Sequence, residues 1–413
     1  MRTFLLAVSA LVLHTGFVVA QSASSLSDAV REFVRVEAPV VALTHVQVVD
    51  GTGGPTTKDR TIVIRNGRIA AVGPSSAVSV PNDAEVLNLA EHTVIPGFIG
   101  LHDHTFYTTR GRRVQLNYSA PRLYLASGVT TIRTTGAFSP YSELNLKRAI
   151  HDGQEIGPRM YITGPYISGT GAATQMMTVA TPEDARRVVA YWADEGVDWF
   201  KVYTRVGQAE LAAVIDEAHK REVKVTGHLC SISFTEAVAL GIDNIEHGFF
   251  TNSDYVENKE QGVCPPGVRE SLLDVDLKGE AVRETIRTMV ESDVAMTSTL
   301  PVYELSVPNR PPLEDRVLEA MAPGAREEYL KTREEIANRD ESPMSTLFPK
   351  AQAFEKALTS KIRLLSFTHV SNTTGLTMPA KALCKLARDR GIFVHVDGAQ
   401  SFGALNVNLA DMG

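Results

Sequence analysis

The sequence predicts an α/β protein, a (β/α)8 barrel of the TIM type preceded by a small unit of β-strands. Short apolar segments alternate with helical patterns at intervals of ~25–35 residues, which is typical of βαβ units and a parallel sheet. Residues 40–92 contain only short strand-like segments. The chain has 413 residues, 44% hydrophobic and 22% charged, which allows two or three structural units with a large core.

The chain begins with a predicted secretory signal peptide over residues 1–20. A short positive start precedes the mostly apolar run Phe4–Ala20, which ends in small residues typical of a cleavage site. A membrane anchor is the alternative, but His14 and Thr15 interrupt the run, and a spanning helix needs ~20 apolar residues. We therefore expect a periplasmic or secreted protein that has no membrane contact after signal cleavage.

The small β unit is predicted over residues 40–92. Its segments 44–49, 61–65 and 68–72 have the alternating pattern of short strands. The pair Asn66-Gly67 separates the last two, and an Asn-Gly pair between such segments is the strongest short hairpin signal.

The barrel is predicted over residues 93–355 without its usual eighth strand, and a C-terminal α/β fragment is expected to complete it abnormally. Long loops that contain Pro and Gly follow the sixth and seventh strands and are expected to shape a substrate pocket. The predicted strands are Val94–Leu101, Val129–Arg133, Arg159–Thr163, Trp199–Tyr203, Val223–Gly227, Asn244–His247 and Val294–Thr299. The clearest helices are Pro182–Glu195, Gln208–Arg221 and Gly279–Ser292.

Two histidines stand at the end of the first barrel strand, in Gly100-Leu101-His102-Asp103-His104. Residues i and i+2 of a strand point to the same face, so His102 and His104 direct two imidazoles into one space. Barrel active sites form at the carboxyl ends of the strands. Alone, one His-x-His pair is a weak signal of a metal site.

Three further strands end in residues that can hold a metal. Lys201 stands inside an apolar strand, where an unpaired ammonium is costly to bury. His228 and His247 end the fifth and sixth strands. Each histidine alone could be an ordinary polar residue at a strand end, and Lys201 a buried ion-pair partner. Their coincidence at one end of a barrel indicates a metal centre.

With these residues, the chain over about residues 40–355 resembles the metal-dependent amidohydrolase superfamily. The branch it resembles is the imidazolonepropionase-like, Xaa-Pro-dipeptidase-like group. The resemblance is carried by His102-x-His104 after an apolar strand, by Lys201, His228 and His247, and by the turn Val49–Gly53.

The resemblance implies a binuclear metal site and a hydrolytic reaction. Lys201 would be carboxylated and would bridge two divalent metals, usually zinc. His102 and His104 would hold one metal, and His228 and His247 the other. A metal-bridging hydroxide would attack a peptide-like or cyclic amide. Tyr203 would hydrogen-bond the substrate, with a packed barrel tyrosine as the alternative.

The resemblance fails at the eighth strand, where family members carry an aspartate that binds metal and transfers protons. The apolar segment Lys361–Asn372 has no aspartate. Asp397 is the only nearby replacement, and we do not expect it to reach because it belongs to a further strand.

The segment from 356 to 413 instead resembles a fragment of class V aminotransferases, the cysteine-desulfurase-like fold. The resemblance lies in Thr368–Gly375 and Ile392–Ser401, with a helix Ala380–Arg390 between them. Asp397 and Gln400 would contact pyridoxal phosphate in that family. The Schiff-base lysine and the phosphate-binding segment are missing, so we do not expect this cofactor to bind. Three explanations of the junction between the two segments are open: a natural fusion, a truncated gene, or a chimera made in sequence assembly.

Composition limits the other functions. A formal net charge of −7 without a basic run argues against nucleic acid. Three cysteines cannot form a disulfide framework, and Cys230 is expected to be a buried thiol rather than a metal ligand.

We expect a small-molecule or dipeptide-like substrate. The second hypothesis is a catalytically impaired chimera that at most binds metal. The third is a lyase-like aminotransferase, against which the missing lysine argues. The oligomeric state is left open.

Overall fold

The structure is a computed structural model. It describes residues 25–51, 54–109, 112–173, 175–313, 315–339, 342–359, 364–368 and 393–397. The predicted signal peptide, the predicted helix 380–390 and Gln400 lie outside the described residues. The chain separates into two compact units, which we describe one at a time. The first comprises Met1–Val48 and Thr57–Thr93, and the second Val49–Thr56 and Val94–Gly413.

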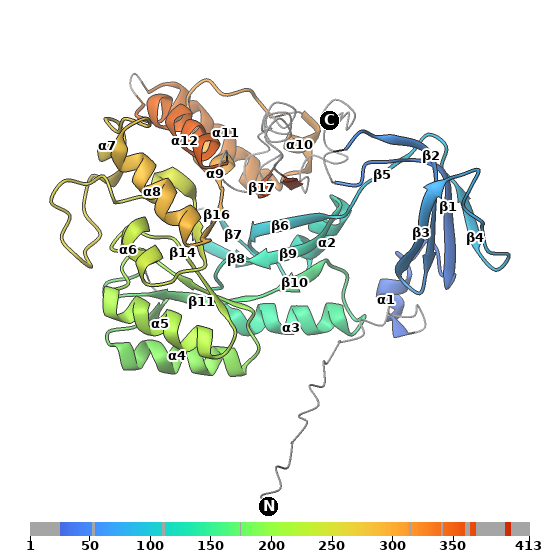
Figure 1. Cartoon of the computed structure of the whole chain (residues 1–413), viewed down its shortest axis with the longest axis horizontal. Helices are drawn as coiled ribbons and strands as arrows, with labels where there is room; N and C mark the ends of the chain where they lie inside the picture. The colour runs from blue at the N-terminus through green and yellow to red at the C-terminus, as the bar shows by residue number, and fades with distance from the viewer. Residues whose placement is uncertain are drawn as a thin grey trace, which may run out of the picture. The chain divides into compact units, whose positions relative to one another are not determined.

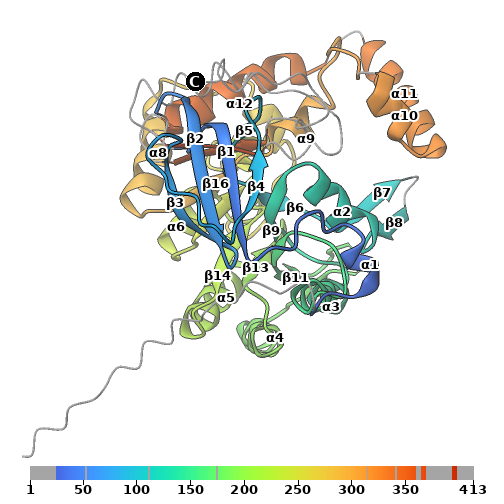
Figure 2. The ribbon, with the colours of Figure 1, turned by 90° about the vertical axis from the view of Figure 1, so that its right-hand side faces the viewer.

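The first unit is a small β-sheet with the order β3-β2-β1-β4 (Figure 2). Strand β2 pairs with β1 and β3 in antiparallel fashion, and β1 pairs with β4 in parallel. Asn66 and Gly67 have φ angles of 49° and 70°, so both adopt the left-handed conformation of the predicted hairpin turn. The elements are α1 (Asp28–Arg31), β1 (Val40–Val48), β2 (Thr57–Arg65), β3 (Arg68–Pro74) and β4 (Glu85–Asn88); β5 (Thr93–Val94) follows.

The second unit contains two larger parallel sheets. One has the order β10-β9-β6, and the other has the order β12-β11-β13-β14-β15-β16. Strands β7 and β8 form an antiparallel hairpin, and the parallel pair β17 and β18 lies with β18 beside β6. The strands are β6 (Phe98–Asp103), β7 (Phe106–Thr109), β8 (Arg112–Gln115), β9 (Val129–Thr134), β10 (Arg159–Tyr161), β11 (Thr163–Ser168), β12 (Met177–Thr178), β13 (Trp199–Val202), β14 (Lys224–Gly227), β15 (Asn244–Glu246), β16 (Ala295–Thr297), β17 (Leu364–Thr368) and β18 (Phe393–Asp397).

Helices alternate with these strands and pack outside the six-stranded sheet, where α4 and α5 lie side by side (Figure 1). Thr181 caps α4 through the amide of Asp184. No helix in the described residues has the length and hydropathy needed to cross a bilayer. The helices are α2 (Ser119–Ala126), α3 (Pro140–His151), α4 (Pro182–Asp194), α5 (Gln208–Lys220), α6 (Phe234–Ala239), η2 (Gly248–Thr251), α7 (Val268–Ser271), α8 (Glu280–Glu291), α9 (Leu300–Glu304), α10 (Asp315–Ala320), α11 (Pro323–Ala337) and α12 (Met344–Thr359).

The structure confirms a mixed α/β fold, with strands close to their predicted positions. The pairings among the described residues form three separate parallel sheets rather than one closed ring, and an isolated bridge between Ala137 and Pro165 links the two larger sheets. The core between strands and helices is apolar, and Phe200, Phe234 and Phe354 are fully buried in it. The parallel strand ends therefore rest on a large hydrophobic core.

The predicted third strand differs from the structure, because it is divided at Ile162 into β10 and β11. Strand β10 pairs with β9, whereas β11 pairs with β13. The amide of Ile162 donates instead to the carboxylate of Asp198 at 2.6 Å, and its carbonyl accepts from the amide of Asp198 at 2.7 Å. The chain thus changes partner at this residue, which an apolar pattern does not reveal.

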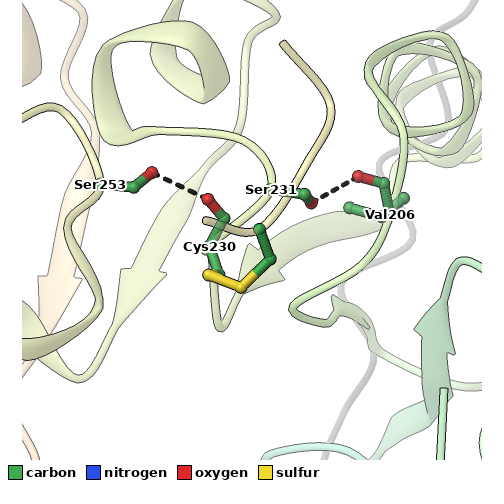
Figure 3. The surroundings of a disulfide bond; sticks show 5 residues. Val206, Cys230, Ser231 and Ser253 are labelled. Carbon is green, nitrogen blue, oxygen red and sulfur yellow. Dashed lines mark hydrogen bonds between the residues drawn. A yellow bond between two sulfur atoms is a disulfide. The ribbon is translucent and has the colours of Figure 1, made fainter. Parts of the chain in front are cut away.

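The prediction of a free thiol at Cys230 is wrong, since Cys230 forms a disulfide with Cys264 (Figure 3). The bond joins the loop after β14 to the loop after η2. Neighbouring hydrogen bonds hold the first loop: Ser253 donates to the carbonyl of Cys230 at 2.8 Å, and Ser231 donates to the carbonyl of Val206 at 2.6 Å. The two cysteines are 34 residues apart, so sequence spacing gave no sign of the pairing.

We expect the replacement of both Cys230 and Cys264 by Ala to lower the free energy of unfolding by about 2–4 kcal/mol, because the bond restricts the unfolded chain. Urea titration with and without reductant measures this change. Reductant should destabilise the native protein and leave the double variant unchanged. An equal effect of reductant on both proteins would contradict the bond's contribution.

Candidate active site

Four strands of the second unit carry the residues that the sequence predicts as metal ligands. His102 lies in β6 and His104 directly after it, and Lys201 lies within β13. His228 follows β14, and His247 follows β15. Because β13, β14 and β15 are adjacent parallel strands, their ends lie along one edge of the sheet.

The four imidazoles form one cluster. The ring centroids of His228 and His247 lie 4.2 Å apart, and those of His102 and His247 lie 4.7 Å apart. The rings of His102 and His104 are 5.3 Å apart. The structure therefore brings these side chains together from three separate strands.

A sharp turn after β15 accompanies the position of His247. Its φ angle is 73°, and that of Gly248 is 62°, so two consecutive residues lie in the left-handed region. Such backbone is uncommon for a residue with a side chain and is found most often at functional sites. Within the cluster, the Nδ1 atom of His247 is hydrogen-bonded to Thr299 Oγ1 at 2.7 Å.

Lys201 is buried beside the cluster, with 1% of its surface exposed. Its Nζ atom lies 5.6 Å from the centre of the Tyr166 ring and 6.0 Å from that of Tyr203. No ion pair joins it to a carboxylate in the part of the chain that the structure describes. Burial lowers the pKa of Lys201 to about 8, against the opposing charge of Glu246. Such a lysine holds its proton less firmly than one in water.

Burial also keeps the imidazoles neutral. It lowers the pKa of His104 and of His228 to about 3 each, with the charge of Lys201 as the second cause. Burial is likewise the main cause that holds the pKa values of His102 and His247 well below their usual range. A neutral imidazole keeps a lone pair for a metal ion.

Glu246 is a central residue of the site that the sequence analysis missed. Its side chain is fully buried, and Oε2 accepts a hydrogen bond from His102 Nδ1 at 2.7 Å. The other oxygen accepts from Arg133 at 2.6 Å, from Thr226 at 2.6 Å and from Asn244 at 2.9 Å.

Arg133 also donates twice to the carbonyl of residue 101 in β6, at 2.7 and 2.9 Å. A charged residue inside an apolar strand, the signal that marked Lys201, also marks Glu246 and Arg133.

Two nitrogen atoms of the cluster are buried without a hydrogen-bond partner in the described residues. They are Nδ1 of His104 and Nε2 of His247. In His102 the bond to Glu246 fixes the proton on Nδ1, which leaves Nε2 as the atom with the lone pair. Buried lone pairs of this kind fit a metal ion. Within the described ranges, however, no three His, Cys, Asp or Glu side chains lie close enough together to hold one metal ion.

Tyr203 lies next to the histidine cluster, as its place two residues after Lys201 predicts. Its ring centroid is 4.5 Å from that of His228 and 5.4 Å from that of Tyr166. Burial raises the pKa of Tyr203, so its hydroxyl is protonated at neutral pH and can donate a hydrogen bond.

The sequence profile of the amidohydrolase family matches residues 93–319, more than half of the chain and the whole region that holds these residues. The chain belongs to the amidohydrolase family. Family membership supports a hydrolase that acts on carbon–nitrogen bonds, and members of this family are generally metal-dependent.

Solved structures of low sequence identity have the same fold. A Xaa-Pro dipeptidase with methionine bound in its active site is 17% identical, with a TM-score of 0.56 over 90% of this chain and 96% of that chain. A bottromycin amidohydrolase is 18% identical, with a TM-score of 0.56 over 89% of this chain and 75% of the other. These likenesses support a fold like a TIM barrel.

The C-terminal part matches a different family, as the sequence analysis predicts. The profile of class-V aminotransferases matches residues 342–413. An isopenicillin N epimerase of Amycolatopsis lactamdurans is 41% identical over 68 residues, which are 16% of this chain and 17% of that protein. A cysteine desulfurase of Serratia proteamaculans is 35% identical over 71 residues, 17% of this chain and 18% of that protein. The chain thus covers about a sixth of the length of the curated relatives that it matches.

We expect Glu246→Leu to lower the free energy of unfolding by about 3–5 kcal/mol, because it leaves Arg133 buried without its carboxylate. The double variant with Arg133→Met removes the unpaired charge and should lose less than the sum of the two single variants. Urea titration of the metal-free protein measures all four forms. A loss of only about 0.5 kcal/mol, as at an exposed position, would contradict the role of this pair.

Proposed function

We propose that the chain is a metal-dependent amidohydrolase that cleaves a peptide-like or cyclic amide bond at the strand ends of a TIM-type barrel. In this proposal His102 and His104 hold one divalent metal, and His228 and His247 hold the second. Lys201, carboxylated, bridges the two, and zinc is the expected metal. Bound metals would supply a hydroxide nucleophile at neutral pH and polarise the amide carbonyl.

The proposal rests on the clustering of four neutral imidazoles near a buried lysine whose charge acts on each of them. Ring centroids 4.2–5.3 Å apart bring several nitrogen lone pairs into a small volume. A purely structural role for so many histidines would leave the buried nitrogens of His104 and His247 without a partner, which is unfavourable. Metal ligation gives each of them one.

The environment of Lys201 supports its carboxylation. Only the free amine reacts with CO₂; it forms the new N–C bond and releases a proton. A pKa lowered to about 8 increases the fraction of free amine at neutral pH. The product is an anionic oxygen donor, which replaces a buried cation by a ligand that offsets metal charge.

The remaining residues of the site would orient the reacting groups. Glu246 holds the ring of His102 in one tautomer, and Arg133 holds Glu246 in place. The hydroxyl of Tyr203 would donate a hydrogen bond to the carbonyl or carboxylate of a dipeptide-like substrate. The disulfide Cys230–Cys264 supports export to the periplasm or medium, because such bonds persist in oxidising compartments.

We expect Lys201→Ala to abolish zinc binding in the bridged site and to lower dipeptide hydrolysis at least ~100-fold, because loss of the residues that only orient metal ligands already costs ~10–100-fold. Lys224→Ala is the matched control, since Lys224 begins the neighbouring strand β14 and is exposed. Zinc content and hydrolysis are measured on protein loaded with zinc in the presence and absence of bicarbonate.

The native protein should need bicarbonate for full zinc loading, and Lys224→Ala should behave in the same way. Zinc binding and hydrolysis that survive Lys201→Ala would contradict the carboxylated-lysine centre. Loading that is independent of bicarbonate would contradict carboxylation.

The second candidate is a chain that binds metal without turnover. The observation that favours it is the strand β17 (Leu364–Thr368), which occurs at the point of the sequence where the family's eighth strand is expected and contains no aspartate. The backbone of β18, whose last residue is Asp397, lies beside β6. If any carboxylate replaces the missing one, Asp397 is the candidate.

Dipeptide hydrolysis by zinc-loaded protein separates the two candidates. Turnover by the native chain would contradict the second candidate, and zinc binding without turnover would support it. If the chain turns over, Asp397→Asn should lower kcat at least ~100-fold, as expected for a general acid–base group, while the exposed Asp274→Asn control leaves it unchanged. An unchanged kcat in Asp397→Asn would show that another group transfers the proton.

A further inference from the structure

Four aromatic side chains and the four histidines form a closed series of neighbouring rings, which we call the circuit. Phe106 lies 4.6 Å from His104 between ring centroids, and Phe138 lies 4.9 Å from Phe106. Tyr166 lies 4.7 Å from Phe138, and it meets Tyr203 at 5.4 Å. Because Tyr203 contacts His228 and the histidines contact one another, the circuit closes. One half is therefore nitrogen-rich, and the other half is apolar.

The backbone is adapted to the apolar half. Gly136 has a φ angle of 90°, and a Cβ atom added there would lie 2.5 Å from the ring of Tyr166. Only glycine combines this conformation with the close approach of the ring. The position of Tyr166 between Phe138 and Tyr203 thus depends on the absence of a side chain at residue 136.

Arg113 places one positive charge over this apolar half. The residue lies in strand β8 of the hairpin, and its guanidinium carbon is 3.9 Å from the centre of the Phe138 ring. Nη1 donates to Gln175 Oε1 at 2.8 Å, and the side chain is exposed. No carboxylate pairs with Arg113 among the described residues.

We infer that Arg113 binds the free carboxylate of the substrate, while the apolar side chain next to that carboxylate rests on Phe106 and Phe138. The inference rests on the proposed function and narrows its substrate class. It assigns short peptides that end in an apolar residue with a free carboxyl group. Arg113 is then a specificity-determining residue, with no part in the bond-breaking step.

The chemistry of the guanidinium and the span of the circuit both favour this occupant. A guanidinium matches a carboxylate with two parallel hydrogen bonds, and the flat face of Phe138 holds it in place. Only Phe106 separates Phe138 from His104 along the circuit. An extended chain advances ~3.3–3.6 Å per residue. A dipeptide whose amide lies near the histidines would therefore place its carboxylate near Arg113.

The first test compares hydrolysis of Ala-Phe and of Ala-Phe amide by the full zinc-loaded chain. Native protein should prefer the acid, and Arg113→Met should raise KM for the acid by about 10- to 100-fold, as for the loss of a charged hydrogen bond. The KM for the amide and both kcat values should change little. Arg113→Lys should restore part of the preference, and the exposed Arg148→Met on α3 should behave as native.

The second test needs no turnover. Titration calorimetry measures binding of N-acetyl-L-phenylalanine and of its carboxamide to the full chain and to Arg113→Met. The acid should bind more tightly to the native protein, and the variant should lose this difference. An acid-to-amide ratio that is unchanged in Arg113→Met would overturn the inference. Absent hydrolysis with an Arg113-dependent preference in binding would overturn the proposed function and leave the carboxylate site standing.

Discussion

The buried contact of Glu246 with Arg133 and His102 is the interaction on which the rest of the site depends. One carboxylate joins β6, β9 and β15, since its partners lie on the first two strands and it belongs to the third. Two charged groups in an apolar core are stable only when each finds a partner of good geometry. Distances of 2.6 and 2.7 Å meet this condition. The pair therefore fixes strand ends that pairing between the two sheets does not join.

This contact also determines the chemistry that His102 can perform. A carboxylate only accepts hydrogen bonds, so the proton of the ring stays on Nδ1 and Nε2 is left as a donor atom for a metal. The same burial that makes the pair necessary lowers the pKa values of the histidines and of Lys201. The exclusion of water from the strand ends thus explains both why the buried ion pair is needed and why the histidines and Lys201 lose their protons easily.

Much of this arrangement could be predicted from the sequence, because strand-end positions in a parallel α/β fold converge whatever their separation along the chain. His102, Lys201 and His247 were found in this way, and the strands lie close to their predicted positions. Glu246 was missed because it precedes a histidine that already explained the pattern. The bond of Cys230 depends on a loop that returns to β14, and the division of the third strand depends on Asp198. Neither leaves a periodic signal.

We propose that five residues, His102, His104, Lys201, His228 and His247, form one binuclear metal centre. Anomalous X-ray diffraction from crystals of the zinc-loaded protein, grown with bicarbonate, tests it most directly. We expect two zinc peaks, one beside His102 and His104 and one beside His228 and His247, with extended density on Nζ of Lys201 between them. Zinc bound elsewhere, or a Lys201 side chain without added density, would contradict it.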